Sequence, residues 1–218
     1  MNRMKKMIIM GLIFSTVIAA CKKEDDNGDN GTDPAVKYKT VKIMTDFGDF
    51  RIWLYQETPL HRDNFIDLTE SGYYDSIIFH RVIEDFVVQG GDPEGTGFGG
   101  PDYTIPAEFV AALKHDHGAV GMARMPDNVN PDKESHGSQF YIVVDQNGEP
   151  SLDGHYTVFG YVFDGIQAVM DISHVETDTN DKPLNDVFIL SAVTEEYTAS
   201  ELKNEFGFDV PRSEEHTS

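Results

Sequence analysis

The sequence is poor in cysteine and in basic residues. Its 218 residues include one cysteine, Cys21, which excludes an internal disulfide framework and any zinc or iron–sulfur site built from several cysteines. Lys and Arg together number 17 against 38 Asp and Glu, so the formal net charge is −21. Because nucleic-acid binding requires a basic surface, we exclude nucleic acid as the main partner.

Long hydrophobic runs are also scarce, and one stands near the N-terminus. Residues 7–20 form a 14-residue stretch without charge behind the basic residues Arg3, Lys5 and Lys6. The stretch is too short to span a bilayer of about 30 Å and is typical of a signal peptide, which we assign to residues 1–20. Its removal would leave a mature chain with a formal net charge of −24.

The cysteine follows this stretch directly. The segment Ile18-Ala19-Ala20-Cys21 resembles the bacterial lipobox, in which the cysteine is lipidated and becomes the first residue of the mature protein. Ordinary secretion, with cleavage near Ala20 and a free thiol, is the alternative. Since the only cysteine occupies the one position that a lipobox requires, we expect a lipid anchor at Cys21. The expected location is the bacterial cell envelope, on the periplasmic face or the cell surface.

Residues 21–38 form a predicted tether. Residues 22–34 include no apolar side chain, a composition typical of a flexible, solvated segment. The Asp, Asn and Gly residues here also suggest a calcium loop. Counting from Asp25, however, puts Asn30 at the position of the loop glycine and Val36 at that of the bidentate glutamate, so the EF-hand pattern fails.

Residues 39–197 carry the pattern of a folded domain. Alternating apolar residues at 41–45 and 50–55 flank a turn and predict a β-hairpin. Pro59 opens a helical pattern that ends at Ser71-Gly72, and a second helix is predicted over 165–173. Short apolar runs bounded by Gly, Pro, Asp or Asn predict further strands at 77–79, 86–88, 119–122, 140–144, 157–162 and 187–193.

Many short strands with two helices predict a mainly β fold. We expect a closed antiparallel barrel, because closure removes exposed strand edges. Fourteen Phe and nine Tyr residues, with 39% hydrophobic residues in all, are sufficient for its core. Residues 198–218 are left as a C-terminal tail.

Four segments, in this order, resemble the cyclophilin-type peptidyl-prolyl isomerases. They are FHRVIEDFVVQGGD at 79–92, GMAR at 121–124, GSQFYI at 137–142 and LDGHYTVFG at 152–160. The resemblance extends over about residues 39–195 and implies an eight-stranded antiparallel barrel capped by two α-helices. It also implies an enzyme without metal or cofactor that acts as a monomer on proline-containing polypeptides.

The chemistry of this family explains the residue types. Rotation about an X–Pro bond crosses a barrier of about 18–20 kcal/mol, and no covalent bond has to break. At the twisted transition state the prolyl nitrogen loses amide resonance and becomes a better hydrogen-bond acceptor. A catalyst therefore needs an apolar slot for the proline ring and a fixed donor aimed at that nitrogen. Arg81, permanently charged and planar, is suited to be that donor.

The resemblance assigns the other roles. Phe86 and Gln89 join Arg81 as catalytic residues, with Gln89 positioning Arg81. The implied substrate-binding residues are Val87, Ala123, Arg124, Gln139, Tyr141, Leu152 and Tyr156, with Arg124 acting mainly through its backbone. Without the resemblance, Phe86, Val87 and Leu152 would be assigned to the barrel core and Arg81 to an ordinary surface position.

The chain departs from the best-known eukaryotic pattern at several positions. Val87 replaces a methionine, Tyr141 a phenylalanine and Tyr156 a histidine. Ser151 replaces a tryptophan associated with cyclosporin binding, so we expect weak cyclosporin binding. The loop Pro126–His136 is longer than in minimal members; it either rims the groove and adjusts substrate choice or is a neutral surface insertion.

Two other patterns in the sequence do not predict a binding site. GTGFGG at 95–100 matches a dinucleotide-binding motif, but Pro101 and a strand-like segment follow it instead of a helix. His115-Asp116-His117 suggests a metal site, but such alternating ligands in a polar loop are usually solvated.

Two functions of different class are therefore open. The first is an active prolyl isomerase that assists the folding of exported proteins, and the second is a non-catalytic module that binds proline-containing segments. Arg81, Phe86, Gln89 and Gln139 together favour the enzyme, because a binder would not need the donors that Arg81 and the two glutamines supply.

Overall fold

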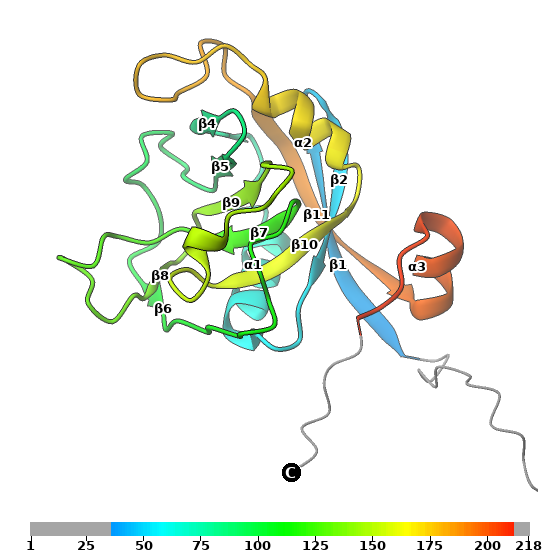
Figure 1. Cartoon of the computed structure of the whole chain (residues 1–218). Helices are drawn as coiled ribbons and strands as arrows, with labels where there is room; N and C mark the ends of the chain where they lie inside the picture. The colour runs from blue at the N-terminus through cyan, green and yellow to red at the C-terminus, as the bar shows by residue number, and fades with distance from the viewer. Residues whose placement is uncertain (1–35, 212–218) are drawn as a thin grey trace, which may run out of the picture. The chain divides into compact units, whose positions relative to one another are not determined.

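The computed structural model describes residues 36–211, which are folded around one curled antiparallel sheet (Figure 1). Neighbouring strands of this nine-stranded sheet follow the order β3-β11-β1-β2-β10-β7-β9-β5-β4, and a second sheet pairs β6 with β8. Their bounds are β1 Lys37–Thr45, β2 Gly48–Leu54, β3 Ile77–Ile78, β4 Arg81–Ile83, β5 Val87–Gly90, β6 Thr104–Ile105, β7 Ala119–Met122, β8 Ser135–His136, β9 Phe140–Val143, β10 Val158–Asp164 and β11 Phe188–Thr198.

The prediction of a mainly β, antiparallel fold is confirmed, with a different strand count from the expected eight. The edge strands β3 and β4 are close in the chain but are not paired, so within the described residues the sheet forms a half-barrel. An isolated bridge joins Ile78 of β3 to Asp92, two residues after the end of β5. Strands of two or three residues, such as β4, β6 and β8, hold too few side chains for a periodic pattern.

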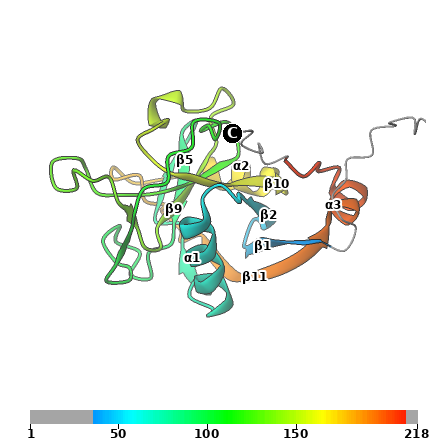
Figure 2. The ribbon, with the colours of Figure 1, turned by 90° about the horizontal axis from the view of Figure 1, so that it is seen from below.

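Both predicted helices are present. Helix α1 spans Pro59–Glu70 with its proline in the first turn, and α2 spans Ile166–Ser173. They lie at different ends of the curled sheet (Figures 1 and 2). A short 3₁₀ helix, η1, covers Pro150–Leu152. None of the helices in residues 36–211 has the length and apolar character needed to cross a bilayer.

A third helix, α3 (Ala199–Phe206), lies in the segment expected as a C-terminal tail. Thr198 caps its first turn and Glu201 bonds back to the Thr198 backbone, which is a complete capping box. Figures 1 and 2 show α3 beside the ends of β1 and β11, on the far side of the sheet from β5 and β9. Trp53 is covered from this side, with its ring 5.4 Å from that of Phe208.

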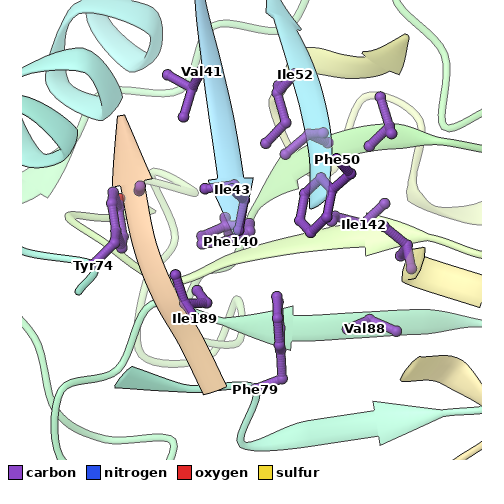
Figure 3. Packing of buried hydrophobic residues seen from close by; sticks show 14 of the residues in the cluster. Val41, Ile43, Phe50, Ile52, Tyr74, Phe79, Val88, Phe140, Ile142 and Ile189 are labelled. Atoms are coloured by element: carbon purple, nitrogen blue, oxygen red, sulfur yellow. The ribbon is translucent and has the colours of Figure 1, made fainter. Parts of the chain in front are cut away.

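Alternation along the strands builds the core. In β1 and β2 the inward-facing residues Val41, Ile43, Phe50 and Ile52 are fully buried, while the intervening positions of β1 are partly exposed (Figure 3). Phe65 of α1 closes the core, with its ring 5.3 Å from that of Phe140. The burial of such side chains drives folding of this half-barrel.

Strands β7 and β9 are buried on both faces. One face of each strand contributes to the main core, and the other contributes to a smaller cluster. The buried members of this cluster are Val87, Ala119, Tyr141, Val143 and Val158. Phe86, Leu152 and Tyr156 pack on it while remaining partly exposed, so the smaller cluster forms the floor of a surface pocket.

Candidate active site

A pocket of about 290 Å³ lies over the smaller cluster. Nine of the ten residues predicted to be catalytic or substrate-binding line it: Arg81, Phe86, Val87, Gln89, Ala123, Arg124, Tyr141, Leu152 and Tyr156. Gln139 is the exception. The predicted lipidation site, Cys21, lies outside the described residues.

Strand register brings the polar end of the pocket together. Arg81 of β4 lies opposite Gln89 of β5, and Gln89 lies opposite Tyr141 of β9. Directly opposed residues of antiparallel strands present their side chains on the same face. Arg81, Gln89 and Tyr141 therefore form one row across three neighbouring strands, although 60 positions separate the first from the last.

Arg81 is held at the mouth of the pocket. Its Nη1 donates a 3.4 Å hydrogen bond to Oε1 of Gln89, and its Nε lies 3.6 Å from Oδ2 of Asp181. The guanidinium carbon is 6.0 Å from the centre of the Phe86 ring. Because its side chain is 37% exposed, the guanidinium has open faces for a ligand while its orientation is restrained.

Gln139 supports this arrangement from behind. It is only 3% exposed, and its Oε1 accepts a 3.2 Å hydrogen bond from Nε2 of Gln89. Its own Nε2 donates to the carbonyl oxygens of Gly97 and Gly99 at 3.1 and 3.0 Å. The structure thus places Gln139 outside the pocket lining, where it holds Gln89 and the glycine-rich loop instead of presenting a free amide to a substrate.

The apolar part of the pocket is a slot between aromatic and aliphatic side chains. Val87 and Tyr141 are 2% and 5% exposed and belong to the buried cluster, so they are both core residues and the floor of the slot. The Tyr156 ring stands at 85° to that of Tyr141, with 6.0 Å between centroids. This geometry suits a compact, apolar ring such as that of proline.

The Arg124 side chain is folded away from the solvent. Only 4% of it is exposed, and its Nε donates a 2.7 Å hydrogen bond to the carbonyl of His155. Its Nη1 lies 2.6 Å from Asp127, and its guanidinium carbon lies 4.6 Å from the centre of the Tyr156 ring. With the side chain engaged in this way, Arg124 presents its backbone to the pocket.

The loop Pro126–His136 borders the pocket. Asp127 binds the pocket residue Arg124, and Lys133 places its Nζ 3.0 Å from Nδ1 of His155, next to Tyr156. Of the two interpretations of this insertion, these contacts favour a rim on the substrate groove.

His115, next to the pocket, differs from the sequence prediction. His115 is not a solvated loop residue: it is 2% exposed, and its Nε2 lies 2.9 Å from the Tyr141 hydroxyl. Its Nδ1 lies 2.9 Å from Oδ1 of Asp153. Burial lowers the pKa of His115, which keeps its imidazole neutral near pH 7. The one available signal was the tyrosine at position 141, whose buried hydroxyl needs a partner.

The chemistry offered by this pocket is non-covalent. Its lining includes two arginines, of which Arg124 has its guanidinium engaged by Asp127 and His155, one primary amide and an apolar slot, and contains no Ser, Thr or Cys nucleophile. Among residues 36–211, no three His, Cys, Asp or Glu side chains gather as metal ligands. The pocket is able to bind an apolar ring in its slot and to direct hydrogen-bond donors at a polar atom of the same ligand.

Comparison with known proteins shows which enzyme family has this fold and pocket. Residues 40–194 match the family model for cyclophilin type peptidyl-prolyl cis-trans isomerases. The chain is 39% identical over 155 residues to peptidyl-prolyl cis-trans isomerase CYP18-2 of Arabidopsis thaliana, covering 69% of this chain and 90% of that protein. It is 39% identical over 158 residues to isomerase cypE of Dictyostelium discoideum, covering 71% of this chain and 96% of that protein.

Solved structures agree. A crystal structure of a cyclophilin type isomerase from Cryptosporidium parvum superposes with a TM-score of 0.67 at 33% identity, covering 72% of this chain and 98% of that one. The same enzyme in the presence of the dipeptide Ala-Pro gives a TM-score of 0.66 at 34% identity, with the same coverage. The chain therefore belongs to the cyclophilin-type peptidyl-prolyl cis-trans isomerases and is an enzyme of that class.

Proposed function

We propose that the protein is an exported isomerase that binds proline-containing segments at the Arg81 pocket and accelerates their rotation while exported proteins fold. Slow X–Pro isomerisation takes tens to hundreds of seconds at 25 °C and limits the folding of many chains. The observation that carries the proposal is the position of Arg81, a restrained cation at the mouth of an apolar slot.

In the proposed mechanism the proline ring enters the slot beside Tyr141 and Phe86. Arg81 then donates a hydrogen bond to the prolyl nitrogen, and this bond strengthens as amide resonance is lost in the transition state. Gln89 keeps the guanidinium in place, and the exposed backbone of Arg124 holds the substrate chain. Ala-Pro, the dipeptide present with the similar Cryptosporidium parvum enzyme, contains an X–Pro bond of the kind that this mechanism requires.

A proline-isomerisation assay on the full chain tests this mechanism. Arg81→Ala removes the donor, and we expect kcat/KM to fall about 100-fold or more, as for other single transition-state donors. Arg62→Ala is the matched control, because Arg62 is paired with Asp63 on α1 and does not line the pocket. Equal rates for Arg81→Ala and the unmodified chain would contradict the role given to Arg81.

The proposal of export rests on the sequence of residues 1–21. The basic segment, the uncharged run and the position of Cys21 support secretion followed by lipidation. Expression in a bacterium with a radiolabelled fatty acid tests the anchor. We expect label in the membrane fraction for the unmodified chain and none for Cys21→Ser. Label-free protein in the culture medium would support ordinary secretion instead, and protein retained in the cytoplasm would contradict export.

A further inference from the structure

We infer that His115 and Asp153 are positioning residues for the isomerase reaction: through the Tyr141 hydroxyl they fix the aromatic wall of the proline slot. The inference deepens the proposed function, because it concerns the same pocket. Neither residue lines that pocket, so each would act through Tyr141.

The three side chains form a continuous hydrogen-bonded chain. The Tyr141 hydroxyl lies 2.9 Å from Nε2 of His115, and Nδ1 of His115 lies 2.9 Å from Oδ1 of Asp153. The backbone N–H of His115 donates to the same carboxylate oxygen at 3.0 Å. The rings of His115 and Tyr141 lie nearly parallel, with an interplanar angle of 13° and 6.0 Å between centroids. Two contacts to one carboxylate leave the imidazole little freedom to rotate.

The direction of each hydrogen bond follows from the carboxylate. Although burial opposes ionisation, hydrogen bonds from His115 and Lys114 lower the pKa of Asp153, so the carboxyl is ionised and acts as an acceptor. Nδ1 of the neutral imidazole must then carry the proton, which leaves Nε2 as an acceptor. The Tyr141 O–H consequently donates to His115.

Gly121 makes room for the hydroxyl. It lies opposite Tyr141 in the β7–β9 register. A Cβ atom added at Gly121 would lie 2.4 Å from both Oη and Cζ of Tyr141, a distance that real Cβ contacts do not reach. Gly121 thus leaves space for the Tyr141 side chain, and His115 accepts a hydrogen bond from its hydroxyl. The hydroxyl is seated in a defined position rather than accommodated in a loose space.

The position of Tyr141 matters for catalysis because its strand, β9, pairs with β5, which carries Gln89. Tyr141 faces Gln89, and Gln89 in turn contacts Arg81. The wall that holds the proline ring and the group that orients the guanidinium are therefore set by the same neighbouring strands. Without its hydroxyl anchor the ring keeps its apolar area but loses its fixed position. Ground-state binding should persist, whereas alignment of the prolyl nitrogen with Arg81 should suffer.

The test compares four variants of the full chain in a steady-state isomerisation assay: Tyr141→Phe, His115→Leu, the double variant, and His115→Gln. We expect each of the first two to lower kcat by about tenfold with little change in KM, since loss of orientation leaves the contact area intact. If His115 acts through the hydroxyl, the double variant loses no more than the worse single one. His115→Gln, whose amide oxygen is able to accept from Tyr141, should recover most of the loss.

His61→Leu is the matched control for loss of a buried histidine. His61 is fully buried and its Nδ1 lies 2.7 Å from Glu108, but it does not line the pocket. Rates are expressed per folded molecule, measured by circular dichroism. We expect His61→Leu to lose stability and keep kcat. An equal loss of kcat in His61→Leu and His115→Leu would reduce the role of His115 to packing and overturn the inference.

Other outcomes are equally decisive. Multiplicative losses in the double variant, or a rise in KM with unchanged kcat, would contradict positioning through Tyr141. If the unmodified chain and His115→Leu were equally active, the inference would be overturned and the proposed function would remain intact. An unmodified chain that is inactive on every proline peptide would overturn the proposed function itself.

Discussion

The carboxylate of Asp181 lies 3.6 Å from Nε of Arg81 and reaches it from a loop 100 residues away in sequence. Asp181 is held in place by its own backbone: its carbonyl accepts a 2.8 Å hydrogen bond from the N–H of Val82, the residue after Arg81. The carboxylate of Asp178 accepts from two backbone N–H groups of this loop, those of Asn180 and Lys182. These hydrogen bonds fix the conformation of the loop that carries Asp181.

The first prediction concerns this pair. Asp181→Asn should lower kcat/KM by about 1.4- to fivefold, because an exposed ion pair contributes about 0.2–1 kcal/mol to holding the guanidinium. High salt should lower the activity of the unmodified chain and affect the variant less, since screening removes the same interaction. The assay compares both proteins at low and high ionic strength. The control is Asp186→Asn, which changes an exposed carboxylate of the same loop outside the Arg81–Asp181 pair.

The second prediction concerns Gln139. Gln139→Leu should destabilise the protein by about 1–3 kcal/mol, because buried carbonyl groups lose their donor. It should also lower kcat/KM, because Gln89 loses the acceptor that holds its amide. Chemical denaturation and the isomerisation assay measure the two effects. Gln167→Leu on α2 replaces an exposed glutamine and should change neither. A Gln139→Leu protein with normal stability would contradict the buried role.

Gln139 and Arg81 show which features of the site the sequence predicts and which it does not. Both residues were assigned through the family resemblance, and both lie at the site. That Gln139 faces inward depends on Gly97 and Gly99, which reach it from about 40 residues away. No local pattern around residue 139 encodes that contact. Likewise, only the folded chain brings Tyr141 to His115.

Local signals, by comparison, were sufficient for the larger elements. The hairpin of β1 and β2 and the helices α1 and α2 have strong periodicity and clear ends, and all are present as predicted. Helix α3 also has a local signal, the Thr198-x-x-Glu201 capping box, which marks a helix start within the segment expected as a tail. Its packing against strands of the sheet could not be predicted, because the aromatic partners come from distant segments.

The third prediction concerns pH. Burial lowers the pKa of four histidines, His61, His80, His115 and His136, below the ordinary value of 6.5. The unfolded chain therefore binds more protons than the folded one once the pH falls below about 6.5. Stability should be full above this pH and should decline progressively as the pH falls through it.

Denaturant unfolding at pH 7.5, 6.0 and 5.0 checks this dependence. His61→Gln should flatten the slope, because it removes one of the buried titrating groups. A free energy of unfolding that stays constant from pH 7.5 to 5.0 would show that these four histidines do not control stability.

The fourth prediction concerns Phe208 and the only tryptophan of the chain. The Phe208 ring lies 5.4 Å from Trp53 and 4.9 Å from Phe163, so it joins the segment after α3 to strands β2 and β10. Phe208→Ala should lower the free energy of unfolding by about 1–3 kcal/mol, since an aromatic contact and part of the cover over Trp53 are lost. Activity should remain, because Phe208 does not line the pocket.

The single tryptophan makes this fourth prediction directly measurable. Trp53 is 3% exposed, so its fluorescence reports on the cover that Phe208 provides. In Phe208→Ala the emission should shift to longer wavelength under native conditions, while the rate of proline isomerisation stays the same. Phe98→Ala, which removes an 85% exposed ring, is the control and should leave the Trp53 emission unchanged. Loss of activity in Phe208→Ala would contradict this prediction. It would show that the segment after α3 affects the Arg81 pocket although Phe208 does not line it.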